Sequence, residues 1–115
     1  MVIRRGDVCW VDFGTPRGSE PAKRRPAVVL QDNWLLDSKI NTILVLPFTS
    51  NVRQSAFPGN VFVPAVVSGL PVDSVAVVAQ AGPVSREFLE PFPVSSLPAS
   101  IMMSIDDGVK LVLGL

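Results

Sequence analysis

The chain alternates short apolar runs with polar segments that are rich in proline and glycine. Apolar runs of about four to eight residues, rich in β-branched side chains and bounded by turn residues, predict β-strands. Two of the runs, 26–30 and 41–48, are almost wholly apolar, which is typical of strands that are buried on both faces. The pattern predicts strands over residues 7–13, 26–30, 41–48, 60–65 and 73–80.

Turn-forming residues predict the connections between these strands. Residues 14–22 hold two glycines, two prolines and mixed charge, so we expect an exposed loop that is longer than a hairpin requires. Pro64 limits the strand at 60–65 to a sheet edge or a strand end, because proline donates no ladder hydrogen bond. Residues 34–40 and 85–89 have room for a helical turn at most, with Ser85 as the cap of the second.

One longer helix is predicted toward the end of the sequence. Ser96 is placed to cap it, and Pro98 falls near its first turn, where a missing N–H is tolerated. Gly108 lies inside this helix and weakens it by about 1 kcal/mol relative to alanine. The apolar positions at helical spacing are Ile101, Met102, Ile105, Val109 and Val112.

Length and composition agree with a small β-rich protein. The 115 residues suffice for one hydrophobic core, so we expect a single domain over residues 1–115. Eleven prolines and eight glycines favour many turns over long helices. The predicted fold is therefore mainly β with α (α+β), a small barrel of about five to seven short strands followed by a helix.

The use of cysteine and histidine, together with hydropathy, limits the class of protein. A single cysteine, Cys9, excludes an internal disulfide, and the lack of histidine excludes a zinc site of the usual His/Cys type. No signal-like segment begins the sequence, and no apolar run reaches the roughly 18–20 residues of a membrane span. We therefore expect a cytoplasmic protein with no membrane association, no metal and no cofactor.

Charge is unevenly distributed although the formal net charge is zero. Residues 1–25 carry six cations and three carboxylates, and residues 26–115 carry the opposite excess. A neutral protein with such a distribution can present one basic face to a polyanion. The densest cluster is Lys23-Arg24-Arg25, directly before an apolar strand, and a guanidinium fork held by a rigid strand suits a phosphate group.

The residues with chemical potential lie near the ends of predicted strands and in the loop 14–22. Because histidine and tyrosine are absent, only carboxylates remain as ordinary acid–base groups. If the strands are neighbours, these residues converge on one rim of the sheet. The candidates are Ser19, Glu20, Arg25, Thr49, Ser50 and Gln80.

Each of the main candidates also has a purely structural interpretation. Arg25 fits a surface cation that pairs with Glu20 or Asp32, an interaction that contributes under about 1 kcal/mol. Thr49 with its neighbour fits a turn cap. Gln80 fits a hydrogen-bonded residue at a strand end.

A series of motifs runs along almost the whole chain in a specific order and spacing. They are Arg5-Gly6-Asp7-Val8, Gly18-Ser19-Glu20, Arg25-Pro26-Ala27-Val28-Val29-Leu30, Pro47-Phe48-Thr49-Ser50, Asp73-Ser74-Val75 and Gln80. In this order they resemble the MazF/PemK toxins of bacterial and archaeal toxin–antitoxin systems. The resemblance implies an SH3-like β-barrel with a C-terminal helix that is assembled as a homodimer. It also implies a cognate MazE-like antitoxin whose acidic tail occupies the rim used by RNA.

The resemblance further implies a metal-independent endoribonuclease that cuts single-stranded RNA to 2′,3′-cyclic phosphate and 5′-hydroxyl ends. It places the catalytic arginine at Arg25 and the catalytic threonine at Thr49. Ser19, Glu20 and Gln80 match positions that border the RNA groove. The general base stays unassigned, with Glu20 as the one carboxylate close in the motif order.

The sequence departs from the family pattern after Gln80. Members often carry an isoleucine and then a basic residue there, and this chain has Ala81-Gly82-Pro83. Lys23 and Arg24 are candidates to supply the lost charge as steering cations, and Ser50 is a further candidate RNA contact. Two alternatives remain: a CcdB-like inhibitor of DNA gyrase, which shares the fold but binds a protein, and a catalytically inactive binding module.

Overall fold

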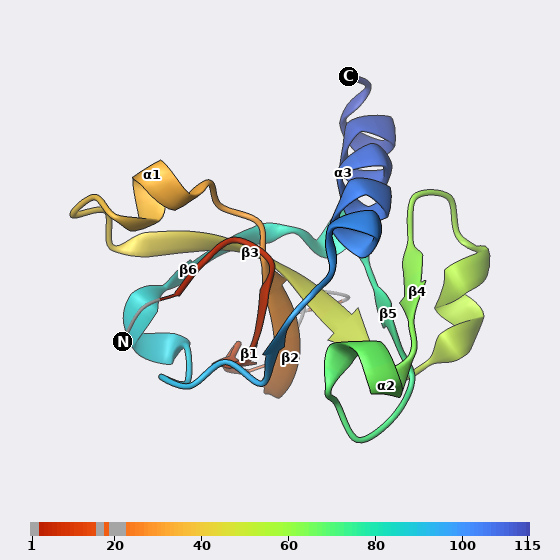
Figure 1. Cartoon of the computed structure of the whole chain (residues 1–115), viewed down its shortest axis with the longest axis horizontal. Coiled ribbons are helices and arrows are strands. Elements are labelled where there is room, and N and C mark those ends of the chain that lie inside the picture. The colour runs from red at the N-terminus through yellow and green to blue at the C-terminus, as the bar shows by residue number, and fades with distance from the viewer. Residues whose placement is uncertain (1–2, 16–17, 19–22) are drawn as a thin grey trace.

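The computed structural model describes residues 3–15, 18 and 23–115. In this part of the chain, antiparallel strands form a curled sheet, and the longest helix, α3, leans against it and points away with the C-terminus at its far end (Figure 1). The sheet order is β4-β5-β3-β2-β1-β7, with β6 also paired to β3. The strands are β1 (Asp7–Asp12), β2 (Arg24–Val29), β3 (Thr42–Thr49), β4 (Val61–Val63), β5 (Ser74–Ala76), β6 (Gly82–Ser85) and β7 (Ser95–Ser96). The helices are α1 (Asn33–Leu36), α2 (Ala65–Ser68) and α3 (Ala99–Leu113), with short 3₁₀ helices η1 (Val52–Ala56), η2 (Val78–Gln80) and η3 (Arg86–Phe88).

β3 crosses the middle of the molecule and organises the sheet (Figure 1). It pairs with β2 along one edge, and along the other edge first with β6 and then with β5. The change of partner occurs near Pro47, whose carbonyl oxygen accepts a hydrogen bond of 3.0 Å from the Val77 backbone N–H. Pro47 has no N–H with which to return that bond, so the β3–β5 ladder stops there. The prediction of one strand over residues 73–80 was therefore wrong in length, because β5 ends at Ala76 and the chain turns into η2.

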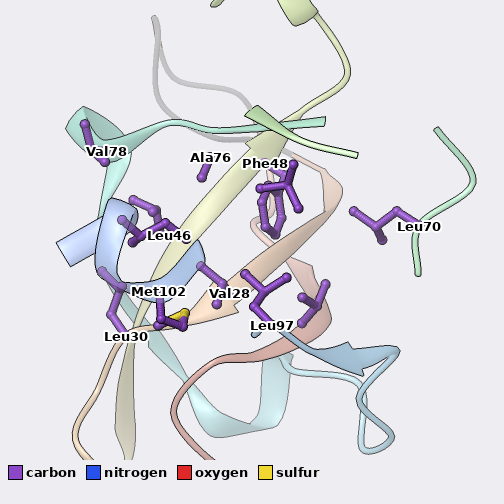
Figure 2. Close-up of a cluster of buried hydrophobic side chains, with 12 residues drawn as sticks. Val28, Leu30, Leu46, Phe48, Leu70, Ala76, Val78, Leu97 and Met102 are labelled. Atoms are coloured by element: carbon purple, nitrogen blue, oxygen red, sulfur yellow. The ribbon is translucent and has the colours of Figure 1, made fainter. Parts of the chain in front are cut away.

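Alternate residues of the strands pack into two hydrophobic clusters on opposite faces of the sheet. The first cluster lies under α3, and Figure 2 shows Val28 and Leu46 from the strands near Met102 from the helix, with Phe48 farther away in the same cluster. The second cluster collects the alternate strand residues on the other face, and its members are Ile3, Cys9, Val11, Ala27, Val29, Leu36, Ile43, Val45 and Leu89. Successive residues of such a strand point alternately into the two clusters, so the strand is buried on both faces. This explains the nearly continuous apolar runs in the sequence.

The predicted caps differ most from the structure. α3 begins at Ala99, and Ser96 lies in β7, where its Oγ donates a 2.6 Å hydrogen bond to Oδ1 of the buried Asp7. Ser85 makes no side-chain cap bond to η3 and instead ends β6. β6 was missed because Gly82-Pro83 resembles a turn, but as a strand paired on one side only it tolerates proline.

The predicted fold is confirmed: the chain is mainly β, with a curled antiparallel sheet and a C-terminal helix. β4 lies at a sheet edge and is followed at once by Pro64, as predicted. Among the described residues, no helix has the length and apolar character to cross a membrane.

Candidate active site

Arg25 lies near the start of β2 and faces the same side of the sheet as the second cluster. The register pairs it with Val11 of β1, and strand alternation puts it on the face of Ala27 and Val29. Those residues are buried, whereas Arg25 is half-buried, so its guanidinium stands where the core opens to solvent. Within the described part of the chain, Arg25 forms no ion pair, and Asp32 is not its partner.

Thr49 ends β3, the strand that pairs with the β2 strand of Arg25. The β2–β3 ladder runs from the Val29–Val45 pair to the Ala27–Pro47 pair, and Thr49 then pairs with Val75 of β5. Thr49 Oγ1 accepts a hydrogen bond of 3.2 Å from the Asn51 backbone N–H. The predicted role as a turn cap is therefore present, and the hydroxyl proton of Thr49 remains available for a second bond. Ser50 follows and is exposed.

Lys23 and Arg24 occupy different environments from Arg25. Lys23 is exposed, has a positive φ of 60°, and joins the ends of β1 and β2 through backbone bonds of 2.6 Å to Gly14 and 2.8 Å from Phe13. Arg24 points to the opposite face of β2, where its guanidinium lies 4.1 Å from the ring centroid of Trp10 and pairs with Glu90. The hydrogen bond from Arg24 holds the pKa of Glu90 below its usual range.

Gln80 lies in η2, and the prediction that it ends a strand was wrong. It lines a groove of about 1140 Å³ between the end of β1 and the segment from Val77 to Ser85. The described residues that line this groove are Asp12, Phe13, Gly14, Gly18, Val77, Ala79, Gln80, Ala81, Gly82, Pro83, Val84, Ser85 and Phe88. The departure from the family pattern at residues 81–83 therefore forms part of one groove wall.

Sequence reasoning missed three side chains of this groove. Asp12 is exposed, and its Oδ1 accepts a 2.9 Å hydrogen bond from the Gly14 backbone N–H. Phe13 packs partly against the second cluster, and Phe88 is 46% exposed. For Phe13, its place at the end of a predicted strand, directly before the long loop, was an available signal. For Phe88 the sequence contains no such signal, because Phe88 reaches the groove only through the fold of β6 and η3.

Three further predictions concern the two loop residues, the cysteine and a metal site. Ser19 and Glu20 lie outside the described residues, so their assignment stays a prediction. Cys9 is buried in β1, and burial, with a smaller effect of the nearby Asp7 carboxylate, raises the pKa of its thiol to about 11. The described residues contain no group of three histidine, cysteine or carboxylate side chains placed to hold a metal ion.

A family model of the PemK-like, MazF-like toxins of type II toxin–antitoxin systems matches residues 4–113. The chain belongs to this family. Endoribonuclease MazF6 of Mycobacterium tuberculosis (strain H37Rv) is 42% identical over 115 residues, with 100% of both chains covered. Endoribonuclease MazF9 of the same organism is 32% identical over 118 residues, which cover 99% of this chain and 98% of the relative. Endoribonuclease EndoA of Bacillus subtilis is 26% identical over 116 residues, which cover 100% and 97%.

Solved structures of MazF proteins share the fold. A crystal structure of MazF from Deinococcus radiodurans superposes with a TM-score of 0.83 at 23% identity and covers 100% of this chain and 99% of that one. The Mycobacterium tuberculosis toxin MazF-mt6 gives a TM-score of 0.78 at 20% identity, covering 95% and 97%. A mycobacterial endoribonuclease in complex with its cognate antitoxin gives 0.73 at 15% identity, covering 98% and 94%. The family match favours the MazF/PemK toxin over the CcdB-like gyrase inhibitor.

Proposed function

We propose that this protein is the toxin of a type II toxin–antitoxin system and a metal-independent endoribonuclease that cuts single-stranded RNA. The observation that carries the proposal is the match of the toxin-family model to residues 4–113, and the structure adds that Arg25 and Thr49 lie on β2 and β3, two strands that pair with each other. RNA cleavage builds negative charge on the nonbridging phosphate oxygens, and donors fixed on rigid strands are suited to stabilise it. The relatives named endoribonucleases, which match along the full chain, add support.

The proposed reaction is attack of a 2′-hydroxyl oxygen on the adjacent phosphorus. The O2′–P bond forms and the P–O5′ bond breaks, so the products carry a 2′,3′-cyclic phosphate and a 5′-hydroxyl. One proton leaves O2′ and one is delivered to O5′. Arg25 donates two parallel hydrogen bonds to the nonbridging oxygens, and the Thr49 hydroxyl donates a third. Arginine keeps its proton at neutral pH, so Arg25 acts as an electrostatic stabiliser and not as the base.

The other predicted residues have supporting roles in this proposal. Lys23, exposed beside the site, steers the RNA strand toward it. Arg24 pairs with Glu90 and lies over the Trp10 ring, so its main role is to hold the start of β2 in position next to Arg25. The proposed RNA contacts are Ser19, Glu20, Lys23, Arg24, Ser50 and Gln80.

The proposal includes the partners of the toxin. Residues 1–115 form one toxin domain that works as a homodimer in the cytoplasm, where its RNA substrate is found. A MazE-like antitoxin with an acidic segment inhibits it by covering the cations beside the site. Structures of a mycobacterial endoribonuclease with its cognate antitoxin and of MazE–MazF from Deinococcus radiodurans support this part.

Cleavage of a long unstructured RNA in EDTA tests the proposal. Wild-type protein is expected to give specific cuts with cyclic-phosphate ends, and Arg25→Ala to lower the rate about 100- to 1,000-fold, as for loss of one transition-state donor. Arg4→Ala is the matched control, since Arg4 pairs with Asp37 on the surface at 2.7 Å. A wild-type rate in Arg25→Ala, or cuts that require Mg²⁺, would contradict the mechanism. No cuts under any condition would favour the inactive binding module.

A further inference from the structure

We propose that Asn60 is a positioning residue for the cleavage reaction, because its side chain holds the segment that orients the Thr49 hydroxyl. This inference rests on the function proposed above and adds to it a residue that does not touch the substrate. Asn60 lies between Gly59 and the first residue of β4, is half-buried, and does not line the groove that contains Gln80. It is therefore placed to act from behind the proposed site.

The side-chain amide of Asn60 joins two segments that are distant in sequence. Its Nδ2 donates a 3.0 Å hydrogen bond to the Gln54 carbonyl oxygen in η1. Its Oδ1 accepts a 3.1 Å hydrogen bond from the Val78 backbone N–H at the start of η2. Only a neutral amide can form both bonds, because a carboxylate has no proton to donate and an apolar side chain can form neither. Asn60 thus uses its donor and its acceptor within the protein, which favours a positioning role over contact with RNA.

The η2 end of this link is rigid. Val78 is buried in the first cluster, and a Cβ at Gly59 would lie 2.9 Å from Val78 Cγ2. The preceding residue, Val77, donates its backbone N–H to the Pro47 carbonyl oxygen of β3 at 3.0 Å. Close packing and a bond to the sheet leave this segment little room to move. Val78 is therefore a fixed anchor for Asn60 Oδ1.

The η1 end depends on hydrogen bonds for its position. None of the η1 residues is buried, and the segment between β3 and β4 stands at the outer edge of the molecule (Figure 1). A segment with few buried apolar contacts opens at low cost unless hydrogen bonds hold it. Asn60 supplies two such bonds, from Nδ2 to Gln54 and from its backbone N–H to the Phe57 carbonyl oxygen at 3.2 Å. The side-chain bond is the one that ties η1 to the η2 anchor.

The position of η1 in turn sets the direction of the Thr49 hydroxyl. Asn51 is the N-cap of η1, and its carbonyl oxygen accepts a 3.0 Å hydrogen bond from the Gln54 N–H. The Asn51 backbone N–H donates a 3.2 Å bond to Thr49 Oγ1. The Thr49 backbone is fixed separately by its pairing with Val75 of β5, so loss of the Asn51 bond frees the side chain and not the strand. Asn60 thus acts on the hydroxyl that donates to the phosphate in the proposed reaction.

These contacts close into a ring that begins and ends on β3. Its members in order are Pro47, Thr49, Asn51, Gln54, Asn60, Val78 and Val77, which returns to Pro47. Each member is held from two sides, so the bonds support one another. A hydroxyl held in this way keeps its donor aimed at the phosphate without reorganisation during the reaction.

NMR measurements on the protein without RNA test the link itself. Asn60→Ala should speed hydrogen exchange of the Asn51 and Val78 amide protons by up to about tenfold, as for loss of one hydrogen bond each. The three-bond couplings about χ1 of Thr49 should become averaged over several rotamers. Asn60→Asp keeps the acceptor for Val78 and loses only the donor to Gln54, so Asn51 alone should exchange faster. Amides of the β2–β3 ladder should exchange as in the wild type.

Single-turnover cleavage of RNA in EDTA, at saturating protein, measures the step after binding. Thr49→Ala should lower its rate about 100-fold, as for loss of one transition-state donor. Asn60→Ala should lower the rate about tenfold, between the roughly threefold expected for a hydroxyl spread over three staggered rotamers and the full loss. In a Thr49→Ala background, Asn60→Ala should change the rate by at most about twofold, because no hydroxyl remains to be oriented.

Matched controls separate positioning from folding and from RNA affinity. Asn41→Ala changes an exposed asparagine that bonds Arg86 through its backbone carbonyl, so it should leave exchange and rate as in the wild type. The Kd of an uncleavable 2′-O-methyl RNA should change by at most about twofold in Asn60→Ala, since no charge is altered. A loss in rate without a loss in affinity is the signature of a positioning residue.

Unchanged Asn51 exchange and Thr49 couplings in Asn60→Ala would overturn the inference, as would rate losses that multiply in the double variant. No cleavage of any RNA by the wild-type protein would instead refute the proposed function, and the NMR comparison would then decide by itself whether Asn60 orients Thr49.

Discussion

Replacing Gly108 by alanine is expected to destabilise the protein, although the same change would stabilise an isolated helix by about 1 kcal/mol. Gly108 is buried where α3 meets the turn at Gly59. A Cβ at position 108 would lie 2.0 Å from the Gly59 carbonyl oxygen and 3.1 Å from Val78 Cγ1. Real Cβ contacts essentially never fall below 3.0 Å, so the helix and this turn would have to separate by about 1 Å.

The loss in the free energy of unfolding depends on how strongly the structure resists this separation. The obstructing atom is backbone, and Gly59 has a φ of +86° and is itself confined by Val78, so neither side yields easily. Overpacking of a close-packed contact costs about 1–3 kcal/mol, and a backbone obstacle places this case near the upper end. After the gain in helix propensity, we expect a net loss of about 2 kcal/mol in the free energy of unfolding.

Urea unfolding at one protein concentration, followed by tryptophan fluorescence, measures this difference. Ser104→Ala is the matched control, because Ser104 lies one turn earlier on α3, is exposed, and only donates a 3.3 Å bond to the Ser100 carbonyl. It should be neutral or stabilising by up to about 0.5 kcal/mol. A Gly108→Ala protein as stable as wild type, or more stable, would refute the close contact of α3 with Gly59.

Two further predictions concern titratable groups. Because the hydrogen bond from Arg24 lowers the pKa of Glu90 in the folded protein, the pair stabilises the fold above the ordinary glutamate pKa of 4.5, and this contribution is lost as pH falls through the lower folded pKa. Glu90→Gln should therefore flatten the acid side of the stability–pH curve in urea titrations, and a curve identical to wild type would contradict the pairing. Cys9 is buried with a pKa of about 11, so a thiol reagent at about pH 8 should label native protein slowly and unfolded protein fast, and rapid native labelling would show that β1 is exposed.

The sequence predicted the elements whose signals are local. The apolar runs around Val28 and Leu46 were recognised as strands because residues buried on both faces leave a continuous pattern. The terminal helix was recognised from helical spacing, and its centre at Ile105 is fully buried. Arg25 and Thr49 were identified by motif order, and the structure shows that they lie on β2 and β3, two strands that pair with each other.

Only the tertiary structure decided which residues meet. Ser96 was expected to cap a helix, but Asp7, far away in sequence, binds its hydroxyl instead. The strand after Asp73 was cut short by Pro47, which lies on another strand and cannot return a bond. A local pattern reports the period of side chains along one segment, whereas these outcomes depend on the hydrogen-bonding groups of a neighbouring segment.

The basic cluster and Gly108 show the same division. Lys23-Arg24-Arg25 is a uniform run of cations in sequence, yet strand alternation sends Arg24 to Glu90 and Trp10 on one face and leaves Arg25 on the other. Gly108 is a poor helix residue by propensity, and the fold retains it because the Gly59 backbone fills the space of its Cβ. The sequence by itself determined the strands, the helix and the candidate catalytic residues. The packing of segments distant in sequence decided their partners, because contacts across the sheet and against α3 are absent from any local pattern.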